Sequence, residues 1–456
     1  MSLTQIFIAS TLYGTATLAA AVDAGSFPPA DRRILLTSNH SVAVEINPRL
    51  ADMPGFATLR TRFDDVLDWN TVIEPQHPSS WSPRADDVPL WERYLRTLWG
   101  LGEDRIELIV ESLQVPPAQA LCRLFPGAAV DVYADGLMSY GPTRVRLDPQ
   151  IGMRVRRVLH LDLVPGLEPL LLTEFGVPAE LVPTDEFLKV LAALAASAPD
   201  GGQLPAARAA GEAPALLLGQ YLSALDLISA QQEEDLHAEM VRGAYALGHR
   251  ELIFKPHPSA PAVYSRRAEA EAERLGADLT IVDTPVLAEI LYQQLHPALV
   301  VGCFSTGLLT AATLFGLPVA RAGTGTVLAA LTPYQNSNRV PLTIVDTLLP
   351  DLADTAAVRG WTAPGPAEVQ SRLSGLLAAV GFAMQPQILT QHRAAAEEYL
   401  TRHLDARTWR YFTRRRLASQ GLPGGIPAQL AFLTRSPVLR SAVRRARRIR
   451  RLRGKR

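Results

Sequence analysis

Residues 298–315 read ALVVGCFSTGLLTAATLF, a short apolar run followed by a small polar turn and a second apolar segment. The run 298–302 has the length and the β-branched residues of a buried strand. The segment 307–315 predicts a helix that packs back on that strand. A strand without a polar face must be covered on both sides, which is typical of parallel sheets in α/β proteins.

The same alternation of strands and helices runs along most of the chain in two blocks. Between them lies 196–214, rich in Ala, Gly and Pro and without a clear period, which we interpret as a linker. We therefore predict doubly wound, Rossmann-like domains at 1–195 and 215–385 that face across a cleft, and C-terminal helices with a basic tail at 386–456. The predicted strands are 5–9, 34–37, 66–73, 106–110, 129–134, 158–164, 215–219, 251–255, 279–282, 298–302 and 318–321. The predicted helices are 15–24, 90–101, 117–125, 184–195, 228–247, 265–275, 286–295 and 307–315.

The composition is that of a globular protein. Of the 456 residues, 48% are hydrophobic and 20% are charged, which excludes a wholly disordered or fibrous chain. Two cysteines, Cys122 and Cys303, are too few for a disulfide framework and suit a reducing cytoplasm. The first 22 residues carry no charge. Because they lack the positive start of a signal peptide and contain many polar residues, they predict a buried strand and an Ala-rich helix.

The net charge of zero hides a basic C-terminal tail. From Arg402 to Arg456 there are 17 Lys and Arg residues against the single acid Asp405. A helix at 437–456 would place an apolar stripe among these cations, formed by Leu439, Val443, Ala446, Ile449 and Leu452. A basic amphipathic helix favours an anionic membrane surface. Nucleic acid is less favoured because no aromatic residue for base stacking follows Phe432, and a solvated, disordered tail is a further alternative.

Chemistry in open parallel sheets is expected at the carboxyl ends of strands. The first such end is Asp135-Gly136, after the predicted strand 129–134. A carboxylate there could act as a general base toward a substrate hydroxyl. The alternative is a simple turn, because Asp-Gly pairs favour turns.

The second strand end is His257, held between Pro256 and Pro258. A rigidly placed imidazole could donate a hydrogen bond or a proton to a leaving phosphate. Two other histidines precede prolines, but His77 lies in a polar loop and His296 precedes its strand. For those two we favour a structural role.

The third strand end is Ser305-Thr306, at the start of the predicted helix 307–315. Backbone amides and hydroxyl groups at a helix N-terminus bind anions, so this segment is a candidate phosphate site. An ordinary helix N-cap is the alternative. The sequence contains no P-loop, His-Glu-x-x-His pair or Gly-x-Ser-x-Gly elbow, and its nine histidines form no evident metal cluster.

An acid–glycine pair, a His-Pro pair and a Ser-Thr pair, in this order and at these separations, resemble the motifs of bacterial sialyltransferases. They are similar in particular to the capsular α-2,8-polysialyltransferases and their actinobacterial relatives, over residues 5–343. The resemblance implies a GT-B fold and a CMP-activated nonulosonic acid (sialic acid or Kdn) as donor. It also implies inversion at the anomeric carbon, no metal and no further cofactor. The acceptor would be a glycan, or lipid-linked glycan, of the envelope or capsule.

The resemblance also suggests roles for individual residues. His257 would assist departure of the CMP phosphate, which Ser305 and Thr306 would bind. Glu289 resembles a glutamate near the nucleotide ribose, although a solvated helix face is an equally open interpretation. The remaining residues implied at the nucleotide site are Gly219, Gln220 and Pro258.

One departure from the family pattern concerns the base. The first position of the acidic motif is Ala134, and in relatives the first acid is the expected base. Asp135 could serve instead, another carboxylate such as Asp131 could, or activity could be altered or lost.

Two competing functions remain. Lys-Pro-His-Pro, residues 255–258, also resembles the polyol-phosphate polymerases of wall teichoic acid synthesis, which use a CDP-polyol. A degenerate, non-catalytic nucleotide-binding partner protein is the other. For an enzyme that extends an envelope glycan, we expect a cytoplasmic location with peripheral attachment to the inner face of the plasma membrane through the basic tail.

Overall fold

Two parallel sheets organise the computed structural model, which describes residues 2–41, 44, 48–197 and 213–425. Among these residues the first sheet has seven strands in the order β3-β2-β1-β4-β5-β6-β7, and the second has five in the order β10-β9-β8-β11-β12. Both lie in one compact unit, residues 1–374, and a second unit starts at Gly375. The predicted α/β class, with the two parallel sheets that a GT-B fold requires, is confirmed. The strands are β1 Leu3–Ala9, β2 Arg32–Thr37, β3 Asp65–Asp68, β4 Arg105–Val110, β5 Ala129–Ala134, β6 Val155–His160, β7 Ala179–Leu181, β8 Ala215–Leu218, β9 Glu251–Lys255, β10 Asp278–Ile281, β11 Leu299–Gly302 and β12 Val319–Arg321.

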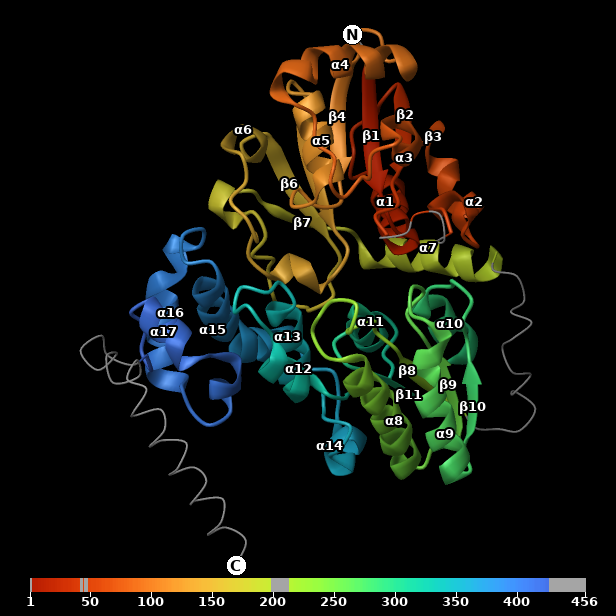
Figure 1. Cartoon of the computed structure of the whole chain (residues 1–456), viewed down its shortest axis with the longest axis vertical. Coiled ribbons are helices and arrows are strands. Elements are labelled where there is room, and N and C mark those ends of the chain that lie inside the picture. Colours follow the sequence, from red (N-terminus) through yellow and green to blue (C-terminus); the bar gives the residue numbers. More distant parts are fainter. Residues whose placement is uncertain (1, 42–43, 45–47, 198–212, 426–456) are drawn as a thin grey trace, which may run out of the picture. The chain divides into compact units, whose positions relative to one another are not determined.

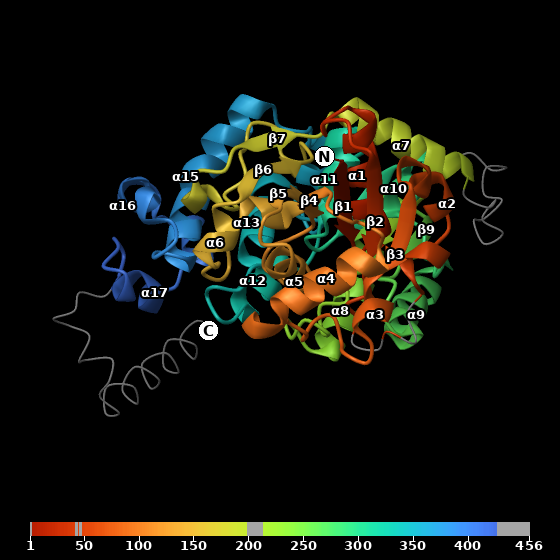
Figure 2. The same cartoon turned by 90° about the horizontal axis from the view of Figure 1, so that it is seen from above.

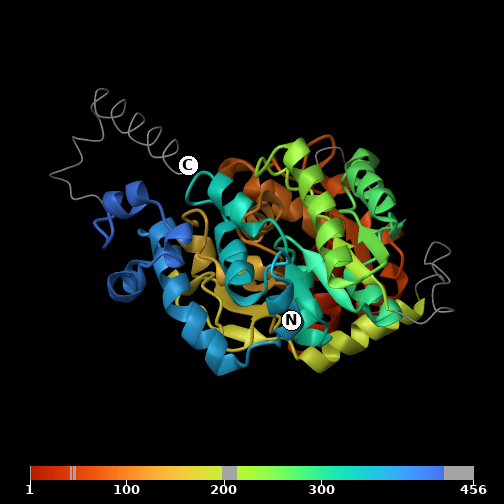
Figure 3. The same ribbon diagram turned by 90° about the horizontal axis from the view of Figure 1, so that it is seen from below.

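Helices cover both faces of each sheet. Figure 2 shows the strands of the first sheet in a row, with α1 and α7 on one face and α4 and α5 on the other. Figure 3 shows the green second sheet from below, with α8 and α9 together along one face. The elements are labelled in Figure 1. The helices that start in the first unit are α1 Leu12–Asp23, α2 Phe56–Leu59, α3 Trp69–Ile73, α4 Val88–Leu98, α5 Pro116–Leu124, α6 Pro149–Gly152, α7 Thr184–Ser197, α8 Ala230–Leu247, α9 Arg266–Leu275, α10 Ala288–Leu295, α11 Thr306–Leu314, α12 Thr324–Ala330, α13 Arg339–Leu348, α14 Thr355–Gly360 and α15 Pro366–Met384.

The uncharged start of the chain is the centre of the first sheet. All seven residues of β1 are buried, and β1 pairs in parallel with β2 and β4. The Thr11 side chain accepts a hydrogen bond of 2.9 Å from the Gly14 backbone N–H and so caps α1 directly after the strand. The prediction of a buried strand followed by an Ala-rich helix is confirmed.

In each sheet there is one point from which the chain adds strands first toward one edge and then toward the other. In the first sheet this switch point lies between β1 and β4, and in the second between β8 and β11. The loops that follow two such neighbouring strands leave a crevice at their carboxyl ends, where α/β proteins bind ligands. Ligand-binding loops are therefore expected after β1, β4, β8 and β11.

Some predicted element boundaries were wrong. The predicted strand 66–73 is strand β3 only to Asp68, and helix α3 follows. Asp68 ends the strand because its side chain caps the helix, accepting a 2.9 Å bond from the Asn70 N–H. Strand β7 was missed because its three residues are exposed at the sheet edge and have no apolar pattern. The predicted strand 158–164 is β6, which ends at His160.

The second unit contains the end of α15 and the helices α16 (Arg393–His403) and α17 (Arg414–Ser419). In this unit the Arg416 guanidinium donates to the carbonyl groups of Ala383 and Met384, which ties α17 to the end of α15. The predicted amphipathic stripe at 439–452 and most of the predicted linker, 196–214, lie outside the described residues. Within the described part of the chain, no helix has the length and apolar character needed to cross a bilayer. The predicted domain limits stay predictions.

Candidate functional site at the carboxyl ends of the strands

Asp135 follows β5 directly, on the face of the strand that also carries Asp131 and Tyr133. Its side chain is partly buried. Loss of water around the carboxyl group and the negative charge of Glu111 raise its pKa to about 7. A carboxyl group whose pKa is raised toward neutral pH is suited to act as a general base.

A glycine lets helix α1 come close to this carboxyl group. A methyl group at Gly14 would lie 3.1 Å from Oδ2 of Asp135, 3.1 Å from the Tyr133 hydroxyl and 3.0 Å from Oγ1 of Thr11. These distances are tight for a carbon atom. Gly14 therefore allows the start of α1 to form one wall beside Asp135.

The two other residues considered for the base have different surroundings. Ala134 lies on the opposite face of β5, where it packs against the apolar core of the first sheet together with Val132. Asp131 is fully buried, and its carboxylate accepts hydrogen bonds from Arg156 and Arg157 at 2.8–3.2 Å. The Asp131 carboxylate is thus neutralised by two arginines, and its role is structural.

Glu111 is a site residue that our reading of the sequence missed. It follows β4 directly and is partly buried. Its Oε2 atom accepts a 3.1 Å bond from the Ser10 backbone N–H and a 2.6 Å bond from the Ser10 hydroxyl. Burial raises its pKa, while the bonds from Ser10 act in the opposite direction. An acid directly after a buried strand is the same signal that singled out Asp135, and it could have been found at residues 106–111.

His257 follows β9 and has an exposed side chain. Its Nδ1 atom accepts a 3.2 Å hydrogen bond from the Ser259 backbone N–H, so a neutral ring carries its hydrogen on Nε2. Displaced water and the positive charge of Lys255 lower its pKa, which favours the neutral ring at neutral pH. The site therefore offers an Nε2–H donor to an incoming group.

The side-chain nitrogens of His77 and Lys255 are hydrogen-bonded to other groups of the protein. Both nitrogens of His77 are occupied, since Nδ1 accepts from the Ser79 N–H at 3.1 Å and Nε2 lies 2.9 Å from the Ser41 carbonyl oxygen. Lys255 is 7% exposed, and its ammonium group donates to the Thr284 carbonyl at 3.0 Å. Burial lowers the Lys255 pKa to about 8. His77 thus has a structural role.

Helix α11 brings the Ser-Thr pair to the end of β5. Ser305 is the N-cap, and its hydroxyl accepts a 3.2 Å bond from the Gly307 N–H, as the alternative interpretation expected. Thr306 is the first helical residue, and its hydroxyl accepts a 3.5 Å bond from the Leu137 N–H. A methyl group at Gly136 would lie 3.3 Å from the same hydroxyl. The acid–glycine end of the first sheet and the helix start of the second sheet are therefore in contact.

Gly219 and Gln220 join the loops of the second sheet at its switch point. The Gly219 N–H donates to the Lys255 carbonyl at 2.9 Å, and a methyl group at Gly219 would lie 2.8 Å from the Phe254 ring. The Gln220 side chain accepts a 2.8 Å bond from the Phe304 N–H. These two residues hold the loops after β8, β9 and β11 together, so the His257 loop and the start of α11 belong to one site.

Glu289 lies in the first turn of α10 and is 4% exposed, so the interpretation as a solvated helix face is wrong. Its carboxyl group accepts a 2.8 Å bond from the Thr310 hydroxyl on α11, and burial raises its pKa. Next to it, the Tyr292 hydroxyl donates to the Gly307 carbonyl at 2.9 Å. The side chains of Glu289 and Tyr292 therefore hold the first turns of α11 in place.

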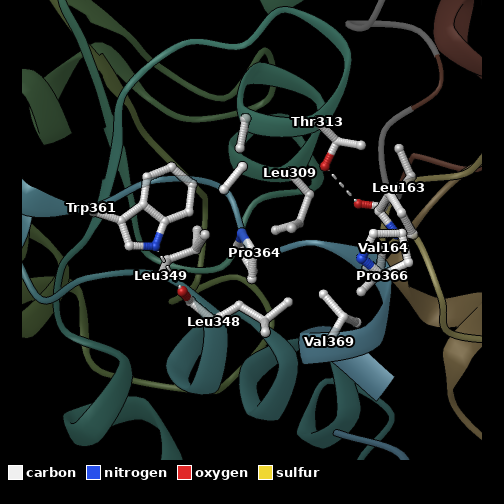
Figure 4. Close-up of a pocket in the computed structure, with 13 residues that line it drawn as sticks. Leu163, Val164, Leu309, Thr313, Leu348, Leu349, Trp361, Pro364, Pro366 and Val369 are labelled. Atoms are coloured by element: carbon white, nitrogen blue, oxygen red, sulfur yellow. Dashed lines mark hydrogen bonds between the residues drawn. The ribbon is translucent and has the colours of Figure 1, made fainter. Parts of the chain in front are cut away.

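An apolar cavity of about 170 Å³ lies elsewhere in the first unit (Figure 4). Two of its lining side chains carry hydrogen-bonding groups. The Thr313 hydroxyl donates to the Leu163 carbonyl at 3.1 Å, and the Trp361 indole N–H donates to the Leu348 carbonyl at 3.0 Å. None of the predicted site residues lines this cavity. The lining is formed by Leu163, Val164, Pro165, Leu309, Ala312, Thr313, Leu348, Leu349, Trp361, Ala363, Pro364, Pro366 and Val369.

Comparison with known proteins gives one family and several distant structures. The family model described as alpha-2,8-polysialyltransferase matches residues 5–324, well over half of the chain. A search of curated protein sequences finds no match. Among the described residues, no three His, Cys, Asp or Glu side chains form a group that could hold a metal ion.

The similar solved structures share little sequence with the chain. The GT-B domain of a sialyltransferase from Photobacterium damselae is 12% identical with a TM-score of 0.39, over 78% of this chain and 97% of that one. MurG from Acinetobacter baumannii is 12% identical with a TM-score of 0.37, over 89% and 98%. The UDP-N-acetylglucosamine 2-epimerase from Rickettsia bellii is 13% identical with a TM-score of 0.43, over 89% and 99%. The assignments of individual residues rest on the contacts described above.

Proposed function

Because the chain belongs to the alpha-2,8-polysialyltransferase family, we propose that this glycosyltransferase moves a nonulosonic acid, sialic acid or Kdn, from a CMP donor to a glycan of the envelope or capsule. Transfer proceeds with inversion and without a metal. The observation that carries the proposal is the contact of Thr306 with Gly136 and Leu137. This contact supports the proposal because the N-terminus of α11, which suits a phosphate, meets the residues that directly follow Asp135, whose carboxyl group suits a general base.

The proposed chemistry assigns one task to each strand end. The N-terminus of α11, with the Ser305 and Thr306 hydroxyls, binds the CMP phosphate. His257 donates a hydrogen bond from Nε2 to that phosphate as the bond between the sugar and the phosphate oxygen breaks. Asp135 accepts the proton of the acceptor hydroxyl, whose oxygen forms the new glycosidic bond. Attack from the face opposite the leaving phosphate inverts the anomeric carbon.

Donor screening tests the proposal. The purified protein is incubated with CMP-sialic acid, CMP-Kdn, CDP-glycerol and UDP-N-acetylglucosamine, each with sialylated oligosaccharides and with cell-envelope extract, with and without EDTA. We expect transfer from a CMP donor only, unchanged by EDTA. Transfer from CDP-glycerol would favour a polyol-phosphate polymerase. Stabilisation by CMP without any transfer would favour the degenerate partner protein.

Replacing Thr306 by valine should weaken CMP binding. The change keeps the shape of the side chain but removes the hydroxyl that we place on the phosphate. A hydrogen bond to a charged group contributes about 1.5–3 kcal/mol, and about 1.4 kcal/mol corresponds to a factor of ten in affinity, so we expect the Kd to rise at least tenfold in titration calorimetry. Thr313→Val, on the same helix, is the control and should leave the Kd unchanged. Equal Kd values for wild type and Thr306→Val would make Thr306 an ordinary helix residue.

We propose that the basic tail binds an anionic membrane surface at the inner face of the plasma membrane. The surplus of cations after Arg402 supports this, because each Lys or Arg near anionic lipid contributes about 1 kcal/mol. Removal of residues 421–456 should therefore abolish sedimentation with vesicles of phosphatidylglycerol while leaving CMP binding intact. Binding of the full chain should weaken steeply with salt. Equal binding to vesicles of phosphatidylcholine alone would contradict this proposal, as would binding to RNA without binding to vesicles.

A further inference from the structure

Glu111 occupies the switch point of the first sheet, where Ser10 and Glu111 follow the neighbouring strands β1 and β4. Two hydrogen bonds from Ser10 fix the Glu111 carboxylate across this point. The second sheet has a similar link, because Gln220 after β8 accepts the Phe304 N–H after β11. In the second sheet that link belongs to the candidate nucleotide site. In the first sheet it holds an acid for which the proposed chemistry has given no role.

Asp135 and Glu111 follow the neighbouring strands β5 and β4. Strands β4 and β5 pair with Val110 opposite Val132, so Glu111 lies level with Tyr133 and Asp135 follows two residues later on the same face, a diagonal separation that a long side chain can span. Burial and then the charge of Glu111 raise the pKa of Asp135, and burial followed by the charges of both acids raises the pKa of the Tyr133 phenol. On α1, the pKa of the buried Tyr13 phenol is raised mainly by burial and then by Glu289 and Asp135.

We propose that Glu111 is a positioning residue of the acceptor site and that it forms a carboxyl pair with Asp135 that holds a single proton near neutral pH. The inference rests on the proposed function, because it takes Asp135 as the base. Two adjacent carboxyl groups resist double ionisation, so one of them keeps its proton. The two hydrogen bonds that Ser10 donates to Glu111 favour the charged form of Glu111, so the shared proton resides on Asp135.

The pair sets the pH at which Asp135 becomes a base. While Glu111 is charged, Asp135 keeps its proton to higher pH and can donate a hydrogen bond to an acceptor hydroxyl. Once Asp135 has lost its proton at higher pH, its carboxylate takes the proton of the attacking hydroxyl and releases it to water after transfer. No other group has to be oxidised or reduced in this sequence.

Glu111→Gln tests the pair because the amide oxygen still accepts the bonds from Ser10 while the charge is lost. In the pH profile of transfer, the acid limb should move to lower pH by about one unit, the size of effect expected for a neighbouring charge. Ser10→Ala should move the limb in the same direction by less, because loss of its hydroxyl raises the pKa of Glu111 and so reduces the charge beside Asp135. Glu174→Gln is the matched control, a partly buried glutamate of the same unit whose pKa is also raised by burial. It should leave the profile unchanged.

A double-mutant cycle tests the pair without any activity. The unfolding free energies of wild type, Glu111→Gln, Asp135→Asn and the double variant are measured in urea from pH 5 to pH 8. The two charges repel each other only when both are ionised, so the coupling should grow with pH, and the double variant should gain less than the sum of the single variants. The cycle of Glu174→Gln with Asp135→Asn should show no coupling.

The outcomes separate the two proposals. Coupling that grows with pH in a protein that transfers no sugar would support the pair and reject the proposed function. Transfer without any coupling between Glu111 and Asp135, and with an unshifted pH profile, would reject the pair and leave the function standing. If Glu111→Gln does not fold, Ser10→Ala takes its place in the cycle with the same expected sign.

Discussion

Replacing His257 by alanine should lower the rate of sugar transfer by about 10²–10⁴-fold, the usual contribution of a positioned proton or hydrogen-bond donor. The side chain is exposed, so its removal should leave the fold intact. The loss arises because the leaving phosphate no longer receives the hydrogen bond from Nε2. Steady-state transfer from CMP-sialic acid measures the rate, and circular dichroism verifies the fold.

His77→Ala is the matched control for this experiment, since both histidines precede a proline and both accept a backbone N–H at Nδ1. They differ at Nε2, which the Ser41 carbonyl occupies only in His77. We expect His77→Ala to transfer at close to the wild-type rate. A normal rate in His257→Ala together with a large loss in His77→Ala would show that we have assigned the wrong histidine.

Replacing Asp135 by asparagine should lower the rate of sugar transfer by a similar factor, while the affinity for CMP stays unchanged. Loss of a general base costs about 10²–10⁴-fold in rate. The nucleotide, by contrast, is proposed to bind the loops of the second sheet. Because burial and Glu111 raise the pKa of Asp135 to about 7, the wild-type rate should fall as the pH drops below that value and level off above it. A rate profile and a CMP titration on the same samples measure both effects.

Asp162→Asn provides the comparison for this variant. Asp162 is another partly buried acid beyond the end of a strand of the first sheet, and burial raises its pKa as well. It should retain both the rate and the pH profile. If Asp135→Asn kept full activity, Asp135 would be a turn former, as its place before Gly136 allows.

The strand ends could be predicted because buried parallel strands leave a clear signal. The predicted strands 129–134 and 251–255 match β5 and β9 residue for residue, since apolar runs bounded by turn residues have sharp limits. The residues that follow them, Asp135 and His257, were therefore placed at the correct edge of their sheets.

The partners of those residues could not be predicted from local patterns. That Thr306 contacts Gly136, that Ser10 holds Glu111 and that Asp131 is neutralised by arginines depend on strand order and on packing between distant segments. Glu289 shows the same limit, because a helix of eight residues does not reveal which of its faces a second helix will cover. In the predicted strand 66–73, the many apolar residues hid the capping effect of Asp68.

The link between Gln220 and Phe304, together with the bond from Gly219 to Lys255, has a consequence for the thermodynamics of binding. Both bonds join groups of the protein itself, so the order that they give the three loops does not depend on a nucleotide. A ligand that meets ordered loops loses little of its binding free energy to conformational entropy. The loops proposed to bind the nucleotide are in this sense preorganised. More of the interaction energy of the phosphate thus remains for discrimination between donors, and little is used to assemble the site.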